Sequence, residues 1–340
     1  MLLNVKENNM SNKHNKHNKH PFHKKFSFPI NVAQIKSGAV DIDWFVKYQN
    51  LINEVYVPAI MFKLGYDAHN SEVIPSEDIK NIMFFLKQIS EKTDIKLCII
   101  FNDIFITEKE EDLKIEELKN YLNNEHYLKI DIIVVPSEKW LIFKSYNIIV
   151  KNTVLLQPSF TEIKSGLFDE YDMVYIHDEV VHNLERFKKI KEDRKFGCVV
   201  NFSDCRSDCP FKNQHYKDFR TYSGDAAQEN IDSYCPANKD LHVINILKGN
   251  AIPRFYSSYL KYVDVLDIFK LQGRWELEAF DECVTIIEDI YNKREHFRCN
   301  ALDTYLTKID QIRWKNEVLN CTGTCIACTF CDDLPKLKID

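Results

Sequence analysis

The sequence predicts a (β/α)8-type TIM barrel with a disordered N-terminal tail and a cysteine-rich C-terminal tail. From about residue 26 onward, short apolar runs rich in Val and Ile alternate with longer amphipathic stretches. Runs that are apolar throughout are typical of strands buried on both faces, and their alternation with helices indicates a parallel sheet. Eight or nine such runs over about 250 residues favour a closed barrel over an open sheet.

The expected strands are spaced so that a helix fits between most of them. They are residues 26–32, 55–62, 97–105, 130–135, 153–157, 173–177, 197–202, 242–247 and 263–270. Apolar residues at helical spacing are clearest in Ser76–Lys92, where Ser76 is a favourable N-cap. Residues 179–191 and 277–293 have the same period and are expected to be helices.

Three parts of the chain differ in composition. Residues 1–25 are an Asn/Lys/His tail with a repeated polar triplet and no apolar face, so we expect disorder there. Residues 26–295 are expected to form the barrel as one unit, because no linker rich in Gly, Ser or Pro divides them. Residues 296–340 are expected to form a C-terminal helix and a metal-binding tail.

Composition and missing motifs exclude several classes of function. The 340 residues carry a net charge of −6, which argues against bulk nucleic-acid binding but leaves a local basic channel open. No apolar run reaches the roughly 18 residues of a membrane span, and no secretory signal is visible. The usual glycine-rich nucleotide-binding motifs are also absent. We therefore expect a cytoplasmic protein, in which the 11 cysteines are core residues, reactive thiols or metal ligands rather than disulfides.

Three cysteines have the pattern of core residues. Cys98 lies inside an apolar run, Cys283 lies at helical spacing from other apolar residues, and Cys299 has no second cysteine at ligand spacing.

A first group of cysteines follows the strand expected at 197–202. Cys205 and Cys209 would lie on the loop at the carboxyl end of that strand, which in a barrel is the active-site face. The three residues between them allow both thiolates to reach one small centre, and Cys235 is expected to return on the next loop. Cys198 lies within the strand, where it either points toward the same centre or packs in the core.

A second group, Cys321, Cys325, Cys328 and Cys331, lies within eleven residues of a polar tail. Four closely spaced thiols indicate a metal site, and both zinc and an iron–sulfur cluster accept four thiolates. The spacing of the first three also matches the signature of radical S-adenosylmethionine enzymes. We reject that interpretation because those enzymes carry it after the first barrel strand, and because Ala327 replaces the usual aromatic residue.

Two segments carry a resemblance to a known family. The stretch from Val199 to Tyr216, with Cys205 and Cys209, and the strand end Ile268–Arg274 resemble the collagenase-like peptidase family U-32. Together they lie within residues 195–292. The resemblance implies a [4Fe-4S] cluster held by four cysteines and an oxygen-independent hydroxylation or modification of RNA or a small molecule. The close cysteine pair and the cysteine tail depart from the family pattern.

The resemblance and the positions of the cysteines lead to one expected ligand set. Cys205, Cys209 and Cys235 are expected to hold the cluster, with Cys198 or a tail cysteine as the fourth ligand. The other tail cysteines would then build a second cluster or a zinc site.

Three further residues are candidates for the site. His215 either donates to a cluster sulfur or to substrate, or is a solvated loop residue. Lys270 and Arg274 are expected at a strand's carboxyl end, where cations hold an anionic substrate or offset cluster charge. The alternatives are a surface charge for Lys270 and a structural ion pair for Arg274.

Three functions are compatible with these observations. The leading hypothesis is an iron–sulfur modification factor acting on an anionic small molecule or RNA, with or without a protein partner. The second is a zinc-stabilised, non-catalytic binding protein. The third is a peptidase, for which the sequence offers only Cys205 with His215, since H-E-x-x-H and G-x-S-x-G are absent.

Overall fold

The computed structural model contains eight parallel strands that form a nearly closed barrel with helices between them, which confirms the expected fold. The described residues are 23–30, 35, 38, 40–62, 64, 76–124, 128–156, 158–177, 180–181, 184–191, 193–201, 211–221, 233–234, 256–273, 277–295, 312–314 and 316–317.

The strands are arranged in the order β5-β4-β3-β2-β1-β8-β7-β6. β5 and β6 stand at the two ends of this order. A single bridge between Lys151 and Met173 connects them and so nearly closes the barrel. The strand bounds are β1 Phe26–Pro29, β2 Ile52–Pro58, β3 Lys96–Ile100, β4 Ile132–Val135, β5 Ile149–Asn152, β6 Val174–Ile176, β7 Phe196–Val199 and β8 Ile268–Lys270.

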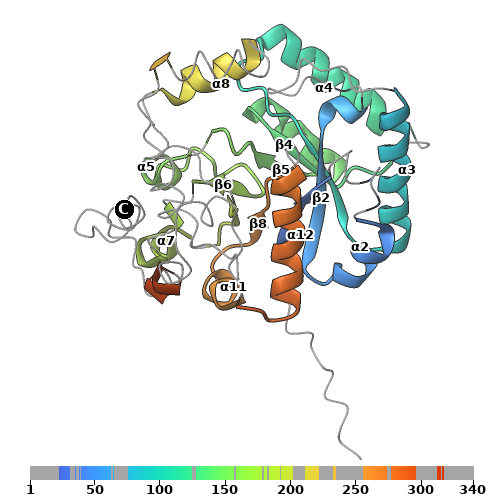
Figure 1. Cartoon of the computed structure of the whole chain (residues 1–340). Coiled ribbons are helices and arrows are strands. Elements are labelled where there is room, and N and C mark those ends of the chain that lie inside the picture. Colours follow the sequence, from blue (N-terminus) through green and yellow to red (C-terminus); the bar gives the residue numbers. More distant parts are fainter. Residues whose placement is uncertain are drawn as a thin grey trace, which may run out of the picture.

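Helices surround the strands, and Figure 1 shows α2, α3 and α12 packed along one outer side. The expected helix Ser76–Lys92 is confirmed with the same bounds as α3. The other helices are α2 Ile42–Tyr48, η1 Ala59–Phe62, α4 Glu108–Leu122, η2 Glu138–Tyr146, α5 Phe160–Lys164, α7 Leu184–Lys191, α8 Lys212–Thr221, α11 Tyr256–Tyr262 and α12 Leu277–Tyr291. No helix among the described residues is both long enough and apolar enough to cross a membrane.

The fifth strand was expected in the wrong place. The apolar run 153–157 suggested a strand there, but β5 is Ile149–Asn152 and ends where that run begins. The polar residues Lys151 and Asn152 interrupt the apolar pattern, yet both are buried. The run expected at 242–247 lies outside the described residues.

Alternate residues of the strands pack into two separate cores. The outward-facing side chains, such as Phe26, Phe28 and Phe269, belong to the large core beneath the helices. The inward-facing apolar side chains form a smaller core inside the barrel: Tyr56, Cys98, Ile100, Ile132, Val134, Met173, Tyr175 and Ile268. This alternation is what a closed sheet with a filled interior requires.

The amino ends of the strands are joined by a motif that occurs three times. Asp131, Asp172 and Asp267 precede β4, β6 and β8, and a carboxylate oxygen of each accepts the backbone N–H of a residue at the start of the neighbouring strand. Each aspartate also donates its own N–H to the carbonyl oxygen of that same residue. A lysine forms an ion pair with each carboxylate, at N–O distances of 2.8, 3.1 and 2.9 Å.

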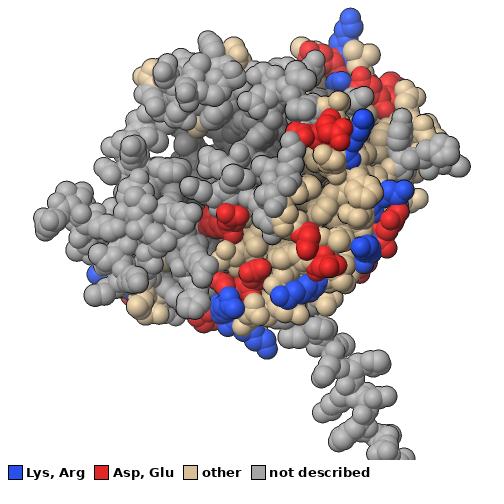
Figure 2. All heavy atoms as spheres, turned by 45° about the vertical axis from the view of Figure 1, so that its right-hand side comes forward, with Lys and Arg blue, Asp and Glu red and all other residues tan. Residues whose placement is uncertain are grey.

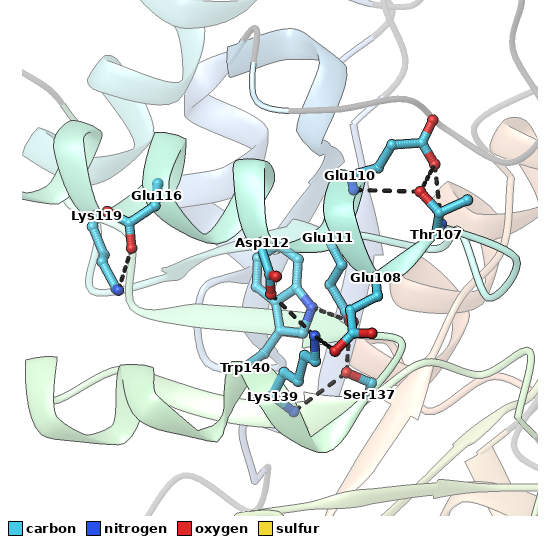
Figure 3. A network of polar contacts seen from close by, with 10 residues as sticks. All are labelled: Thr107, Glu108, Glu110, Glu111, Asp112, Glu116, Lys119, Ser137, Lys139 and Trp140. Carbon is cyan, nitrogen blue, oxygen red and sulfur yellow. Dashed lines mark hydrogen bonds and ion pairs between the residues drawn. The ribbon is translucent and has the colours of Figure 1, made fainter.

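A polar network fixes α4 against η2 (Figure 3). The buried carboxylate of Glu111 accepts hydrogen bonds from Trp140 Nε1 at 2.8 Å and from Ser137 Oγ at 2.6 Å. Thr107 caps the first turn of α4, and the Glu110 carboxylate accepts the backbone N–H of Thr107 in return. These contacts satisfy polar groups where the chain leaves β3 and β4, and so hold the helix layer in register with the sheet.

Candidate functional site

The carboxyl ends of the strands carry a ring of buried polar side chains. Asn102 follows β3, Thr153 follows β5 and His177 follows β6, and each is at most 5% exposed. Thr153 Oγ1 donates to Asn102 Oδ1 at 2.9 Å, which connects the ends of β3 and β5 across the end of β4. The structure thus places Asn102 and His177 at the carboxyl ends of strands.

Asn201, just beyond the end of β7, is fixed by two hydrogen bonds. Asn201 Oδ1 accepts the backbone N–H of Gln272 at 2.7 Å, and Asn201 Nδ2 donates to the Gln272 carbonyl at 2.6 Å. The side-chain amide therefore continues the hydrogen bonding between β7 and β8 beyond the last paired residues.

Inside the barrel, β2 and β5 are joined by a buried ion pair. Lys151 Nζ lies 2.6 Å from Glu54 Oε2, and the two side chains are 1% and 0% exposed. Burial favours the neutral carboxyl and would raise the pKa of Glu54, but the adjacent Lys151 ammonium outweighs it and the pKa is lowered. Glu54 is therefore ionised in the folded protein.

A second lysine lies in the same interior. The Lys270 ammonium is 4.7 Å from the ring centroid of Tyr56 and 5.0 Å from that of Tyr175. These are cation–π distances. Lys270 is only 4% exposed, so the surface-charge alternative is wrong.

The neighbouring tyrosine and cysteine are held in their neutral forms. Burial and the nearby Glu54 carboxylate raise the pKa of Tyr175 and that of the Cys98 thiol. Gly197 makes room for the Tyr175 ring, because a Cβ at that position would lie 2.7 Å from a ring carbon. The Tyr175 hydroxyl lies 3.4 Å from Glu54 Oε1.

Cys198 packs on the helix side of the sheet. It is 1% exposed and belongs to the outer core, whereas its neighbours Gly197 and Val199 occupy inward positions. This location favours the packing alternative for Cys198. Cys98 and Cys283 are buried as expected for core residues.

His215 lies on the first turn of α8 instead of on a loop, and it is partly buried. Figure 1 shows α8 (yellow) at the opposite end of the molecule from α11, the helix that leads into the amino end of β8. Helix α8 therefore lies on the side of the barrel where the strands have their carboxyl ends.

Helix α8 and the residue before it contact residues 233–234. The rings of Phe211 and Tyr234 have centroids 5.6 Å apart, and the Tyr234 hydroxyl donates to Asp218 Oδ2 at 2.6 Å. Phe211 follows Cys209 by two residues, and Tyr234 directly precedes Cys235. Two chain segments that border expected cluster ligands are thus in contact.

Most of the expected ligands lie outside the described residues. These are Cys205, Cys209, Cys235, Cys321, Cys325, Cys328 and Cys331. The substrate-binding candidate Arg274 also lies outside the described residues. Within the part of the chain that the structure describes, no group of three or more His, Cys, Asp or Glu side chains is arranged to hold a metal ion.

Comparison of the chain with known proteins identifies no relative. Neither the protein-family models, nor the curated proteins, nor the solved structures contain a match to this chain.

Sequence reasoning missed Glu54 and Lys151. The signal was present, because a charged residue inside an otherwise apolar strand is unusual and here occurs in β2, β5 and β8. Only Lys270 was recognised, because it lies in the stretch Ile268–Arg274 that carries the family resemblance.

Proposed function

We propose that this protein is an iron–sulfur barrel of the U-32-like type, with its cluster on the loops beyond β7 and α8. Its ligands in this proposal are Cys205, Cys209 and Cys235, with a cysteine of the C-terminal tail as the fourth. The buried, outward-facing position of Cys198 favours the tail over Cys198 for that role. A reducing cytoplasmic location is consistent with free thiolates.

The observation that carries the proposal is the contact between Phe211 and Tyr234. Consecutive Cα atoms are about 3.8 Å apart, so Cys209 lies within about 8 Å of the Phe211 Cα and Cys235 within about 4 Å of the Tyr234 Cα. Both cysteines therefore lie within a few residues of one tertiary contact although they are remote in sequence, and ligands supplied by separate loops suit one cluster. The contact supports convergence of the two cysteines from separate loops.

The donor set suits the cofactor and leaves zinc as the competing metal. Four thiolates accept either iron–sulfur or zinc. A cluster would supply redox chemistry, as the hydroxylation or modification of an anionic small molecule or RNA requires. A zinc centre would instead indicate a non-catalytic binding protein.

The test is anaerobic purification of the full chain with analysis of iron, sulfide, zinc and visible absorbance. Cys209→Ala and Cys235→Ala should each lose most of the iron and the absorbance near 400 nm, because thiolate ligands act together. Cys283→Ala is the matched control, since that thiol is buried in the outer core, and it should keep the wild-type spectrum. A colourless protein with stoichiometric zinc, or full iron in both ligand variants, would refute the proposal.

A further inference from the structure

Four inward-facing polar residues lie close together inside the barrel and have no role in the proposed metal centre. Ser27, on β1, pairs in register with both Glu54 of β2 and Lys270 of β8. Its neighbours Phe26 and Phe28 pack in the outer core, so Ser27 occupies an inward position. Lys151 of β5 reaches the same carboxylate, Glu54, from across the barrel.

Two of these side chains have hydrogen-bonding capacity that the described residues do not use. An ammonium has three N–H donors, and the one hydrogen bond of Lys151 within the described part of the chain is to Glu54. Ser27 Oγ is buried beside Glu54 and Tyr175 but makes no hydrogen bond of good geometry there. Buried donors without acceptors are costly and rare in folded proteins, so they indicate a bound group.

The buried charges of the strands favour an anion as that group. The residues of β1 to β8 bury one carboxylate, Glu54, and two ammonium groups, Lys151 and Lys270. Outside the barrel, by contrast, acidic and basic side chains are interspersed over the described face in Figure 2. Two ammonium groups and a hydroxyl are donors that suit the oxygens of a carboxylate or phosphate.

The depth of the residues limits what can reach them. Lys151 and Lys270 are 1% and 4% exposed, and Lys270 is the last residue of β8, at the carboxyl end of the barrel. Residues this deeply buried favour the terminal group of a small molecule over a polymer backbone as the ligand. We propose that the barrel interior binds the oxyanion group of a small molecule through Ser27, Lys151 and Lys270.

The experiment measures binding of inorganic phosphate and, separately, of malonate to the full chain by isothermal titration calorimetry. Sodium chloride at matched ionic strength is the blank. The wild type should bind at least one of the two probes. The probe that binds more tightly identifies the ligand group as a phosphate or a carboxylate. Lys270→Met and Ser27→Ala should each weaken that binding at least tenfold. Lys139→Met should bind as the wild type does, because Lys139 lies outside the barrel on η2.

Several outcomes would overturn the proposal. The wild type could bind neither probe, or both interior variants could bind as tightly as the wild type. A loss of affinity in Lys139→Met equal to that in the interior variants would also overturn it. Lys270→Met leaves the Glu54–Lys151 pair in place, and Ser27→Ala removes a single atom, so the second variant decides if the first does not fold. Iron content measured on the same samples separates this result from the proposed cluster, because the interior variants keep every expected ligand.

Discussion

The ion pair between Glu54 and Lys151 shows how single residues determine the chemistry inside this barrel. A buried carboxylate is expensive unless an opposite charge and hydrogen bonds compensate it. The 2.6 Å contact with Lys151 provides that compensation. Burial raises the pKa of Cys98 and that of Tyr175, and the charged Glu54 carboxylate adds to this, so both groups stay protonated. Cys98 is therefore an unreactive thiol despite its central position.

Removing one partner of this pair should be more harmful than removing both. Lys151→Met leaves the Glu54 carboxylate buried without its cation, and we expect a loss of about 3–5 kcal/mol in the free energy of unfolding. The double variant Glu54→Gln, Lys151→Met should recover most of that loss, because neither charge of the pair is then left buried without its partner. Urea unfolding followed by circular dichroism measures both. Equal stability of the single variant and the wild type would contradict the prediction.

The same pair predicts how stability depends on pH. The pKa of Glu54 is lowered in the folded protein, so its stabilising contribution is present above the ordinary value of 4.5 and is lost as pH falls through the lowered folded value. The wild type should therefore lose more unfolding free energy below pH 4.5 than the double variant does. Thermal unfolding in a series of buffers from neutral to acidic pH tests this. Parallel curves for the two proteins would show that Glu54 does not contribute.

At the scale of elements, the repeated aspartate motif explains how neighbouring strands are aligned at their amino ends. Asp267 accepts the Phe196 N–H at 3.0 Å and donates its own N–H to the Phe196 carbonyl. Lys191 holds the carboxylate at 2.9 Å and also donates to the Val265 carbonyl. The motif therefore joins β7, β8 and the last turn of α7, and Asp131 and Asp172 repeat the strand-to-strand part of it.

Replacing Asp267 tests the motif. Asp267→Ala leaves the buried Phe196 N–H without an acceptor, and we expect a loss of about 1–3 kcal/mol. Asp267→Asn keeps an oxygen that can accept that N–H and loses only the partly exposed ion pair, so its loss should be smaller. Denaturant unfolding of the two variants measures the difference. If both lose the same amount, the ion pair rather than the hydrogen bond is what stabilises this junction.

For the whole molecule, the sequence predicted the barrel but not how the barrel is closed. Apolar strands that alternate with helices were sufficient to identify the architecture, because burial on both faces leaves a continuous apolar signal. Glu54, Lys151 and Asn152 interrupt that signal and were missed, since a residue inside a barrel is recognised by its partners on other strands. The contact of Phe211 with Tyr234 likewise depends on tertiary structure, whereas Cys205, Cys209 and Cys235 were predicted as ligands from their spacing, their place after a strand and the family resemblance.

The seam between β5 and β6 is closed with the help of two side chains, Asp172 at the amino end and Asn152 at the carboxyl end. One backbone bridge connects these strands, whereas β7 and β8 share three register pairs. Asn152 adds the missing contacts, because its Oδ1 accepts the Tyr175 N–H at 2.5 Å and its Nδ2 donates to the Tyr175 carbonyl at 3.1 Å. The side-chain amide thus replaces a pair of backbone hydrogen bonds.

We therefore expect Asn152→Ala to weaken the whole barrel more than Asn201→Ala, which removes a similar amide from the well-paired β7–β8 edge. Both variants leave backbone groups unsatisfied, at about 1–3 kcal/mol for each buried group. At the β5–β6 seam the other described backbone and side-chain bonds are one bridge and the Asp172 contacts with Val150, so the loss of Asn152 should have the larger effect there. Amide hydrogen exchange should show faster exchange along both β5 and β6 in Asn152→Ala, and a local change limited to Gln272 in Asn201→Ala. Equal and local effects in the two variants would show that the barrel is closed by packing of its interior rather than by Asn152.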